Sequence, residues 1–345
     1  WFAIPGREYT LNDCVKINFA AGFDVALREM LADSNVKPSI QELWWRFEKH
    51  LRRAAEVTAE GIDFHMEHMH DVFPELVLDL FSHGPIEKGL DASHGGVEFY
   101  NICVDGSALA TVADSFAALE QRIKREGRLT WQELLRHLDN DFADAEDVRL
   151  MLRNIPRYGC GRTLADEWAV RIAQTFTRLV KEKPSPTGFN MIPGLFSWAS
   201  AITMGLEVGA TPNGRRAHAP ISHGANPDPG FMKGGGAPTA MAVAVASVQC
   251  GYGNTAPLQL DMDPILARGE EGLAKVEALI RGHFALGGTM INMNVINRQQ
   301  ILEAHEDPSK YPDLIVRVTG FSAYFASLSK DVRQLVVDRI ITEEH

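Results

Sequence analysis

The spacing of hydrophobic residues predicts that the first third of the chain is helical. From 13 to about 32, apolar side chains recur at the period of an amphipathic helix. Ser39 followed by Glu42 has the pattern of a capping box, which marks the start of a helix. The long helix that it opens continues over 43–70, with a break expected near Gly61. The first third is therefore predicted to be a helical scaffold.

The middle of the chain changes character. The segment HGGVEFYNICVDG (94–106) has paired glycines and alternating apolar positions, which predict a strand that leads into a loop. Amphipathic helices with polar faces suited to an outer surface are predicted next, over 112–125, 130–142, 144–154 and 164–183. Residues 184–239 are dense in glycine and proline and are predicted to form a long, irregular connection. Loops of this length in a compact domain usually serve function.

The last third alternates between helical and extended patterns. Helices are predicted over 238–248, 270–284, 298–305 and 330–341, strands over 258–262, 289–297 and 314–318, and an exposed turn over 319–322. Strands that are separated by helices indicate an α/β fold class. No internal repeat is apparent in the sequence.

Composition excludes several classes of protein. With 345 residues, 45% hydrophobic and 23% charged, the chain is typical of a globular protein with a large core. Its net charge of -11 comes without any basic block, so nucleic acid is not a predicted partner. No apolar run has membrane-spanning length, and no membrane association is predicted. The four cysteines lie far apart without a CxxC pair, which favours a reducing cytoplasm. Because Trp1 is not an initiator Met, we expect the chain to begin inside a longer protein.

The segment LIVRVTGFSAYF (314–325) carries the strongest chemical signal. Taken alone, it is a β-branched strand that ends at Gly320, where glycine supplies a positive φ at a loop tip. In context, Arg317–Phe325 resembles the glycyl radical motif. The resemblance continues through GGTMINMNVINRQQILEAHEDPSKYPDLIV, SLSKDVRQLVVDRII, PGREYTLND, GGVEFYN and GATPNGRRAHAPISHGANPDPG. Over essentially its whole length, the chain resembles glycyl radical enzymes of the pyruvate formate-lyase and diol dehydratase type.

This resemblance implies an architecture. The chain would supply the later strands of a ten-stranded α/β barrel of two antiparallel halves, surrounded by helices, with a C-terminal glycyl radical loop in its centre. Residues 1–225 would be the C-terminal part of the barrel domain, truncated at its N-terminus just after the cysteine loop. Residues 226–345 would be the glycine radical domain. Gly320 is then expected to be buried, because a glycyl radical must be kept from oxygen.

The resemblance also implies a reaction. A radical S-adenosylmethionine activase with a [4Fe-4S] cluster would remove an α-hydrogen from Gly320, so the enzyme itself needs no bound cofactor or metal. Only glycine lacks the Cβ that would crowd the planar radical. The radical would pass to a thiyl cysteine just upstream of Trp1, which abstracts hydrogen from a small-molecule substrate. The fragment alone is expected to be inactive. The activase is the implied partner, and a homodimer is also compatible with the resemblance.

Three residues are candidates for binding the substrate. Asp13 matches, in its spacing from Pro5, a carboxylate that contacts substrate hydroxyls in the diol dehydratases; the alternative is a helix N-cap. Asn292 and Asn294 alternate with apolar residues, so one face of 289–297 can present amides to a cavity. The alternative is a hydrogen-bond network between strands. Arg317 is expected to hold the loop through backbone carbonyls or a carboxylate.

Other chemistry-bearing residues favour structural roles. The cysteines Cys14, Cys103, Cys160 and Cys250 could replace the thiyl cysteine, but free cysteines are commonly buried as small hydrophobes. His65, His68 and His70 do not share one helical face, and HExxH is absent, so no metal site is predicted. The glycine-rich loops contain no Walker or dinucleotide pattern.

The leading functional hypothesis is a radical lyase of the dehydratase or decarboxylase type. Three alternatives stay open at this point: formate C-acetyltransferase activity, a radical-bearing partner subunit that associates with another polypeptide, and a non-catalytic scaffold. The intact segment around Gly320 argues against the scaffold.

Overall fold

A computed structural model describes residues 4–11, 15–182, 185, 188–197, 199–232, 237–254, 256–318 and 320–340. The helices are α1 (Phe19–Ala32), α2 (Ile40–Val72), α3 (Leu76–Phe81), α4 (Pro85–Lys88), α5 (Leu109–Leu119), α6 (Trp131–Asp139), α7 (Glu146–Arg153), α8 (Leu164–Glu182), α9 (Ser200–Leu206), α10 (Ala237–Ser247), α11 (Gly269–Ala285), α12 (Arg298–Glu306) and α13 (Lys330–Ile340). The strands are β1 (Glu8–Tyr9), β2 (Val15–Asn18), β3 (Phe99–Ser107), β4 (Asn190–Leu195), β5 (Leu258–Met262), β6 (Ile291–Val295), β7 (Ile315–Arg317) and β8 (Ser322–Tyr324). The fold class is α/β, as predicted.

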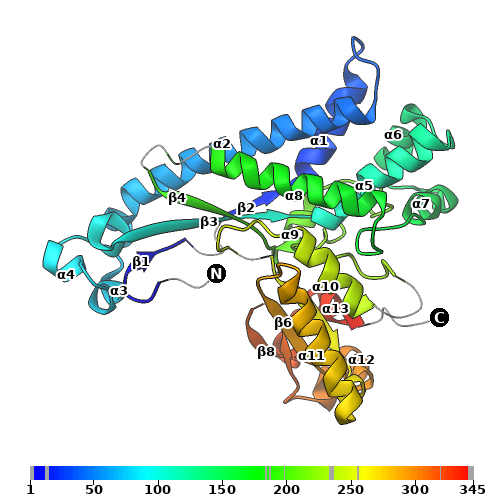
Figure 1. The fold of residues 1–345 in the computed structure, drawn as a ribbon. Coiled ribbons are helices and arrows are strands. Elements are labelled where there is room, and N and C mark those ends of the chain that lie inside the picture. Colours follow the sequence, from blue (N-terminus) through cyan, green and yellow to red (C-terminus); the bar gives the residue numbers. More distant parts are fainter. Residues whose placement is uncertain are drawn as a thin grey trace.

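A parallel sheet organises the first two thirds of the chain. Strand β3 lies at its centre and pairs in parallel with β1, β2 and β4. In this register Val104 lies opposite both Val15 and Pro193. Helices α2, α5 and α8 run along one face of the sheet (Figure 1). Parallel strands need such a cover, because their crossovers place helices on the faces.

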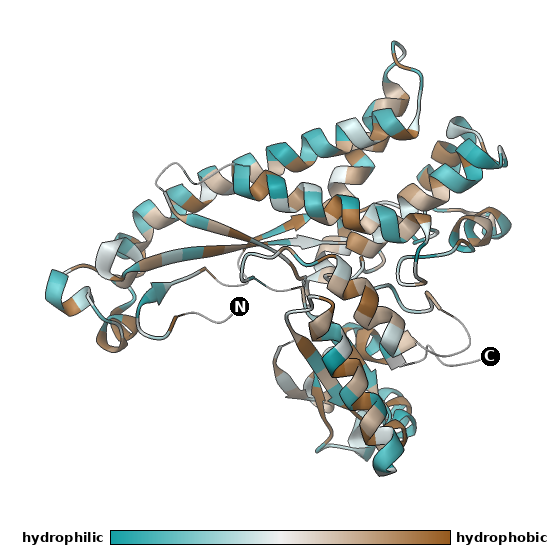
Figure 2. Ribbon diagram, viewed as in Figure 1, coloured by the Kyte–Doolittle hydropathy of each residue, from teal (hydrophilic) through white to brown (hydrophobic). Residues whose placement is uncertain are grey.

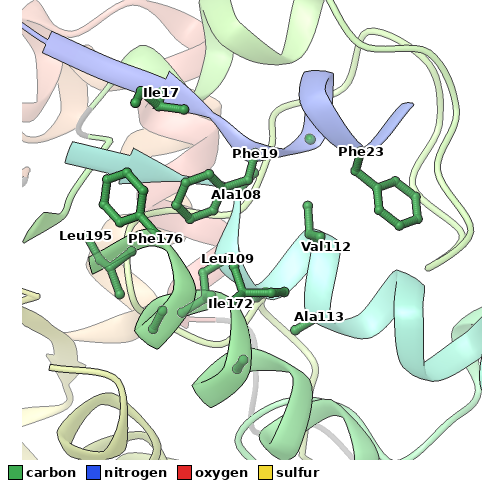
Figure 3. Close-up of a cluster of buried hydrophobic side chains, with 14 of the residues drawn as sticks. Ile17, Phe19, Phe23, Ala108, Leu109, Val112, Ala113, Ile172, Phe176 and Leu195 are labelled. Atoms are coloured by element: carbon green, nitrogen blue, oxygen red, sulfur yellow. The ribbon is translucent and has the colours of Figure 1, made fainter. Parts of the chain in front are cut away.

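The main core lies between this sheet and its helices. Phe19, Phe23 and Phe176 are almost fully buried there, beside residues of α5 (Figure 3). The ring of Phe19 packs directly on the β3 backbone, because a Cβ at Gly106 would meet it at 2.1 Å. Every residue of α5 is buried. The predicted polar outer face is therefore wrong over 112–119, because this helix lies between α1 and α8 and not at the surface. Beyond its end, Lys124 and Arg125 are exposed, as predicted.

Other predicted elements also need correction. Helix α2 runs unbroken through Gly61, which faces open space. Within the predicted helix over 13–32, residues 15–18 form β2, and Asn18 caps α1 instead. Strand β4 and helix α9 lie in the stretch predicted to be irregular. Pro193 is tolerated in β4 because, among the described strands, only β3 pairs with it.

The C-terminal unit, residues 237–340, lies on the side of the sheet opposite α2 and α8 (Figure 1). Strands β5 and β6 are parallel, whereas β7 and β8 form an antiparallel hairpin. A second core, which includes Ile301, Val316, Phe325 and Val336, joins the hairpin to α12 and α13. The sequence predicted α10 to α13 and β5 to β7 to within a few residues. The β8 strand was missed, because its three residues follow the turn directly.

The helices that cover the sheet are amphipathic. Figure 2 shows hydrophilic and hydrophobic residues interleaved along α2 and α8, as expected for helices that cover a sheet. Within the described ranges, no helix combines the length and the apolar character that are needed to cross a bilayer.

Candidate active site

Gly320 lies at the tip of the β7–β8 hairpin. The backbone N–H of Val318 donates to the carbonyl of Phe321 at 2.9 Å and closes the turn. Gly320 has a φ of +105°, in a region that other residues rarely adopt. A Cβ built on Gly320 would meet no described atom within 4 Å. The backbone conformation, and not crowding, therefore favours glycine at this position.

The predicted burial of Gly320 is wrong for this structure. Gly320 is exposed, and so is Phe321 beside it. The reason is that the described residues hold the hairpin from its base, through β6 and α13, and place nothing over its tip. Shielding of a radical at Gly320 would have to come from residues other than those described.

Asn294 fixes the strand that leads to the glycine. The backbone N–H of Arg317 donates to Oδ1 of Asn294 at 2.5 Å, and Nδ2 of Asn294 donates to the Arg317 carbonyl at 2.6 Å. This amide pairs with the backbone as a neighbouring strand would. Its Nδ2 also donates to Oδ1 of Asp261 on β5 at 2.5 Å. Asn294 thereby links β5, β6 and β7.

Asn292 and Arg317 form a second link. Nε of Arg317 donates to Oδ1 of Asn292 at 3.0 Å, and Nδ2 of Asn292 donates to Oε1 of Gln259 at 2.7 Å. Arg317 thus holds the hairpin through a side-chain amide, not through the carbonyl or carboxylate that we expected. Asn292 is 9% exposed and Asn294 is 6% exposed. These contacts agree with the network between strands, and substrate binding by the two asparagines stays a prediction.

Arg339 on α13 supports the residues just before the glycine. Its Nε forms an ion pair with Oδ2 of Asp261 at 3.0 Å, and its Nη1 donates to the Val318 carbonyl at 3.0 Å. The Asp261 side chain is only 1% exposed. Because buried carboxylates are costly without a charged partner, this pair couples the fold of α13 and β5 to the position of the hairpin.

A cavity of about 580 Å³ lies next to this network, with Val318, Asp261 and Arg339 on its wall. Another part of its wall comes from the 199–231 segment, whose length and whose stretch GATPNGRRAHAPISHGANPDPG both pointed to function. His223 of that segment lines the cavity. Its Nδ1 lies 3.0 Å from Oγ of Ser197, which itself accepts the N–H of Gly224. With the Ser197 hydroxyl assigned as the donor to Nδ1, the ring proton of a neutral His223 lies on Nε2.

Burial lowers the pKa of His223 from 6.5 to about 3, and the positive charge of Arg339 adds to this effect. Below about pH 6.5, His223 binds a proton in the unfolded chain but stays neutral in the folded chain. The free energy of unfolding therefore falls as the pH decreases below about 6.5. We expect the free energy of unfolding to fall by about 2 kcal/mol from this residue between pH 7 and pH 5. Urea titrations at both pH values measure the loss.

His223→Gln is the matched variant for this prediction. Carboxylates also titrate between pH 5 and pH 7, but they do so equally in both proteins. The difference in pH dependence between wild type and His223→Gln should therefore isolate the imidazole. Parallel stability curves for the two proteins would contradict the prediction.

Of the remaining candidates from the sequence, the structure describes only Cys103, Cys160 and Cys250 and the three histidines of α2. Asp13 and Cys14 lie outside the described residues. Burial raises the pKa of Cys103 to about 12 and that of Cys250 to about 11, so both thiols stay protonated. The thiol of Cys160 donates to the Phe231 carbonyl at 2.9 Å. In the described part of the chain, no group of three or more His, Cys, Asp or Glu residues is arranged to hold a metal ion.

Comparison with known families divides the chain into two matched segments. The family described as "Pyruvate formate lyase-like" matches residues 1–205. The family described as "Glycine radical" matches residues 221–326, which include Gly320 and its supporting residues Asp261, Asn292, Asn294 and Arg317 but not Arg339.

Individual relatives match almost the whole chain. The trans-4-hydroxy-L-proline dehydratase of Clostridioides difficile is 28% identical over 341 residues, which are 96% of this chain and 41% of that protein. An isethionate sulfite-lyase of Desulfovibrio desulfuricans is 31% identical over 375 residues, 99% of this chain and 43% of that protein. A solved structure concerning 1,2-propanediol dehydration in Roseburia inulinivorans has a TM-score of 0.90 at 27% identity and covers 99% and 45% of the two chains.

The chain thus spans less than half the length of these relatives. The matched segments cover both the parallel sheet and the hairpin that carries Gly320. On this evidence, the chain belongs to the pyruvate formate lyase-like family of glycyl radical enzymes.

Proposed function

We propose that this chain belongs to a radical lyase of the dehydratase or decarboxylase type, with Gly320 as the residue that stores the radical. The observation that carries the proposal is Gly320 itself, which lies at a hairpin tip with a positive φ inside the segment matched as a glycine radical domain. Loss of its α-hydrogen leaves a radical that is delocalised over the neighbouring amide nitrogen and carbonyl. The missing Cβ leaves that plane uncrowded.

Exposure of Gly320 supports a role for a separate activating enzyme. A protein that removes the α-hydrogen must reach the glycine, and an exposed hairpin tip allows this. We therefore infer that the partner is a radical S-adenosylmethionine activase, whose [4Fe-4S] cluster supplies the electron for removal of the α-hydrogen. In this proposal the enzyme binds no cofactor of its own, and the glycyl radical is a post-translational modification.

The rest of the proposal concerns the whole enzyme. The thiyl cysteine would lie just upstream of Trp1, and Asp13 would bind a substrate hydroxyl. Residues 1–225 would complete a ten-stranded α/β barrel with the preceding half of the enzyme, and 226–345 would form the glycine radical domain. The covered tip of Gly320 would then face the thiyl cysteine. The location would be cytoplasmic, and the assembly a homodimer.

The names of the relatives suggest the class of substrate. They act on hydroxyproline, on isethionate and, in one decarboxylase, on indoleacetate. We propose that the substrate is a small hydroxylated or carboxylated molecule. Formate C-acetyltransferase activity stays an alternative that no contact in the structure favours.

A second candidate function is a radical-bearing partner subunit without catalysis of its own. The exposed tip of Gly320 is the specific observation that favours it, because another polypeptide could then supply both the cover and the cysteine. The two candidates differ in whether the cysteine loop is encoded in frame with this chain. Sequencing of the transcript upstream of Trp1 distinguishes them directly.

Anaerobic incubation with an activase and S-adenosylmethionine, followed by electron paramagnetic resonance, tests the radical role. We expect a doublet signal, and cleavage of the chain at Gly320 after a brief exposure to air. The activase must first be shown to activate a relative of this family. With such an activase, the absence of a doublet would contradict the assignment of Gly320.

A further inference from the structure

The cavity beside the hairpin has the size of a small-molecule site. Its volume of about 580 Å³ lies in the range that ligand pockets usually have. It lies between the 199–231 segment and the C-terminal unit. One side of it is apolar and is formed by Met262, Leu266, Ile296, Val332, Leu335 and Val336.

Arg215 lines the cavity as a half-buried cation that no described carboxylate contacts. Its Nη1 donates to the carbonyls of Arg216 and Ala219 at 2.6 and 3.0 Å. Its Nη2 donates to the carbonyls of Val208 and Gly209 at 3.1 and 2.8 Å. These partners are neutral, and among the described residues no carboxylate contacts the guanidinium. Its fifth N–H, on Nε, is buried and has no partner in the described chain. Burial lowers the pKa of Arg215 to about 10, which shows how poorly its charge is solvated.

Arg153 at the end of α7 lines the same region of the cavity. The loop before Arg215 packs directly on it, because a Cβ at Gly214 would lie 3.0 Å from Cβ of Arg153. In the described residues Arg153 forms no ion pair or hydrogen bond. Burial and the nearby charges of Arg157 and Arg149 lower its pKa. Arg153, which is exposed, and Arg215 thus line one cavity, and in the described chain neither is in direct contact with an acid.

The other unsatisfied polar groups on the wall can also donate. Nε2 of His223 carries the ring proton in the tautomer argued above, and it is buried without a partner in the described chain. Nε2 of Gln259 is likewise buried without a hydrogen-bond partner in the described chain, and Gln259 is only 2% exposed. Buried donors without partners are costly, and a ligand with acceptor oxygens would satisfy them.

Each acidic side chain on the wall, in contrast, already has a partner. Each carboxylate accepts at least one bond: Asp228 from Arg157, Asp261 from Arg339 and Asn294, Asp263 from the N–H groups of Ile265 and Arg298, and Asp338 from Gln334. The cavity therefore offers donors that have no partner in the described chain, whereas each of its carboxylates has at least one basic, amide or N–H partner. Such a wall attracts an anion and gives no special advantage to a cation.

We propose that this cavity binds a small organic monoanion, with its carboxylate or sulfonate group against Arg215 and Arg153 and its apolar body against β5 and α13. The site is separate from Gly320 and needs no radical. It can therefore be tested on protein that has not been activated, and its failure would leave the proposed function untouched.

Isothermal titration of the unactivated protein tests the site with benzoate and benzenesulfonate as probes and benzamide as the neutral counterpart. We expect each anion to bind at least tenfold more tightly than benzamide, because only the anions supply the missing counter-ion. Equal affinity for anions and benzamide, or no binding of either anion, would overturn the proposal.

Variants of two adjacent arginines give a matched pair for this test. Arg215→Gln should weaken benzoate binding at least tenfold. Arg216→Gln should not change it, because Arg216 pairs with Glu146 at the surface and does not line the cavity. Should Arg215→Gln fail to fold, Arg153→Gln removes the second cation at a position without described bonds and should also weaken binding severalfold. Unchanged affinity in the folded arginine variants of the cavity would refute the site.

Discussion

Replacement of Gly320 by alanine is expected to reduce the glycyl radical signal at least a hundredfold and to leave the protein folded. The α-carbon of alanine carries a methyl group, which takes the place of one α-hydrogen and crowds the planar radical. The fold should tolerate the change, because a Cβ at this position meets no described atom within 4 Å. The positive φ alone costs about 1 kcal/mol. Spin quantification after activation and urea unfolding measure the two effects separately.

Gly287 provides a matched control for this experiment. It has a φ of +97°, and a Cβ there would also meet no described atom within 4 Å. Gly287→Ala should therefore lose a similar amount of stability, about 1 kcal/mol, and keep the full radical signal. A Gly320→Ala protein that still gives the doublet would show that the radical lies elsewhere. Equal loss of signal in both variants would attribute the effect to backbone strain.

The sequence predicted best those helices and strands that are determined by neighbouring residues in the chain. Ser39 opens α2 by accepting the N–H of Glu42, and Thr130 forms the capping box of α6. In β4, local cues pointed the wrong way, because proline and glycine are typical of loops. Gly194 is required there for a tertiary reason: its Cβ would meet Asn254 at 2.3 Å and Asp105 at 2.5 Å. Such contacts join distant segments, and a local pattern does not contain them.

In the candidate site, too, the sequence predicted the features that have a local cause and missed those that depend on the fold. Gly320 could be found from its motif, and its positive φ follows from the residue type. The alternating asparagines marked one face of β6, but nothing local showed that Asn294 would pair with the backbone of Arg317. The exposure of Gly320 was not predictable from the chain, because it depends on what lies over the hairpin. His223 and Arg215 were missed, since only the fold reveals their unsatisfied donors.

Loss of the ion pair between Arg339 and Asp261 is expected to have the largest effect on stability. Arg339→Met leaves the Asp261 carboxylate, which is 1% exposed, without its cation and also removes the hydrogen bond to Val318. Removal of one partner from a buried pair typically costs about 3–5 kcal/mol. We therefore expect the free energy of unfolding to fall by about 3 kcal/mol, measured by urea titration. The Val318 amide should also exchange its hydrogen faster, because the turn at Gly320 loses its support.

Two further variants test the cause of this loss. Arg281→Met removes an exposed pair with Glu277 on α11 and should cost no more than about 0.5 kcal/mol. Asp261→Asn combined with Arg339→Met removes both charges, so the double variant should be more stable than Arg339→Met alone. A cost below 1 kcal/mol for Arg339→Met, or a double variant that is less stable than the single one, would show that the pair is not what holds the hairpin. The hydrogen bonds of Asn294 would then be the main support for the residues before Gly320, because they fix Arg317 from β6 without any charge.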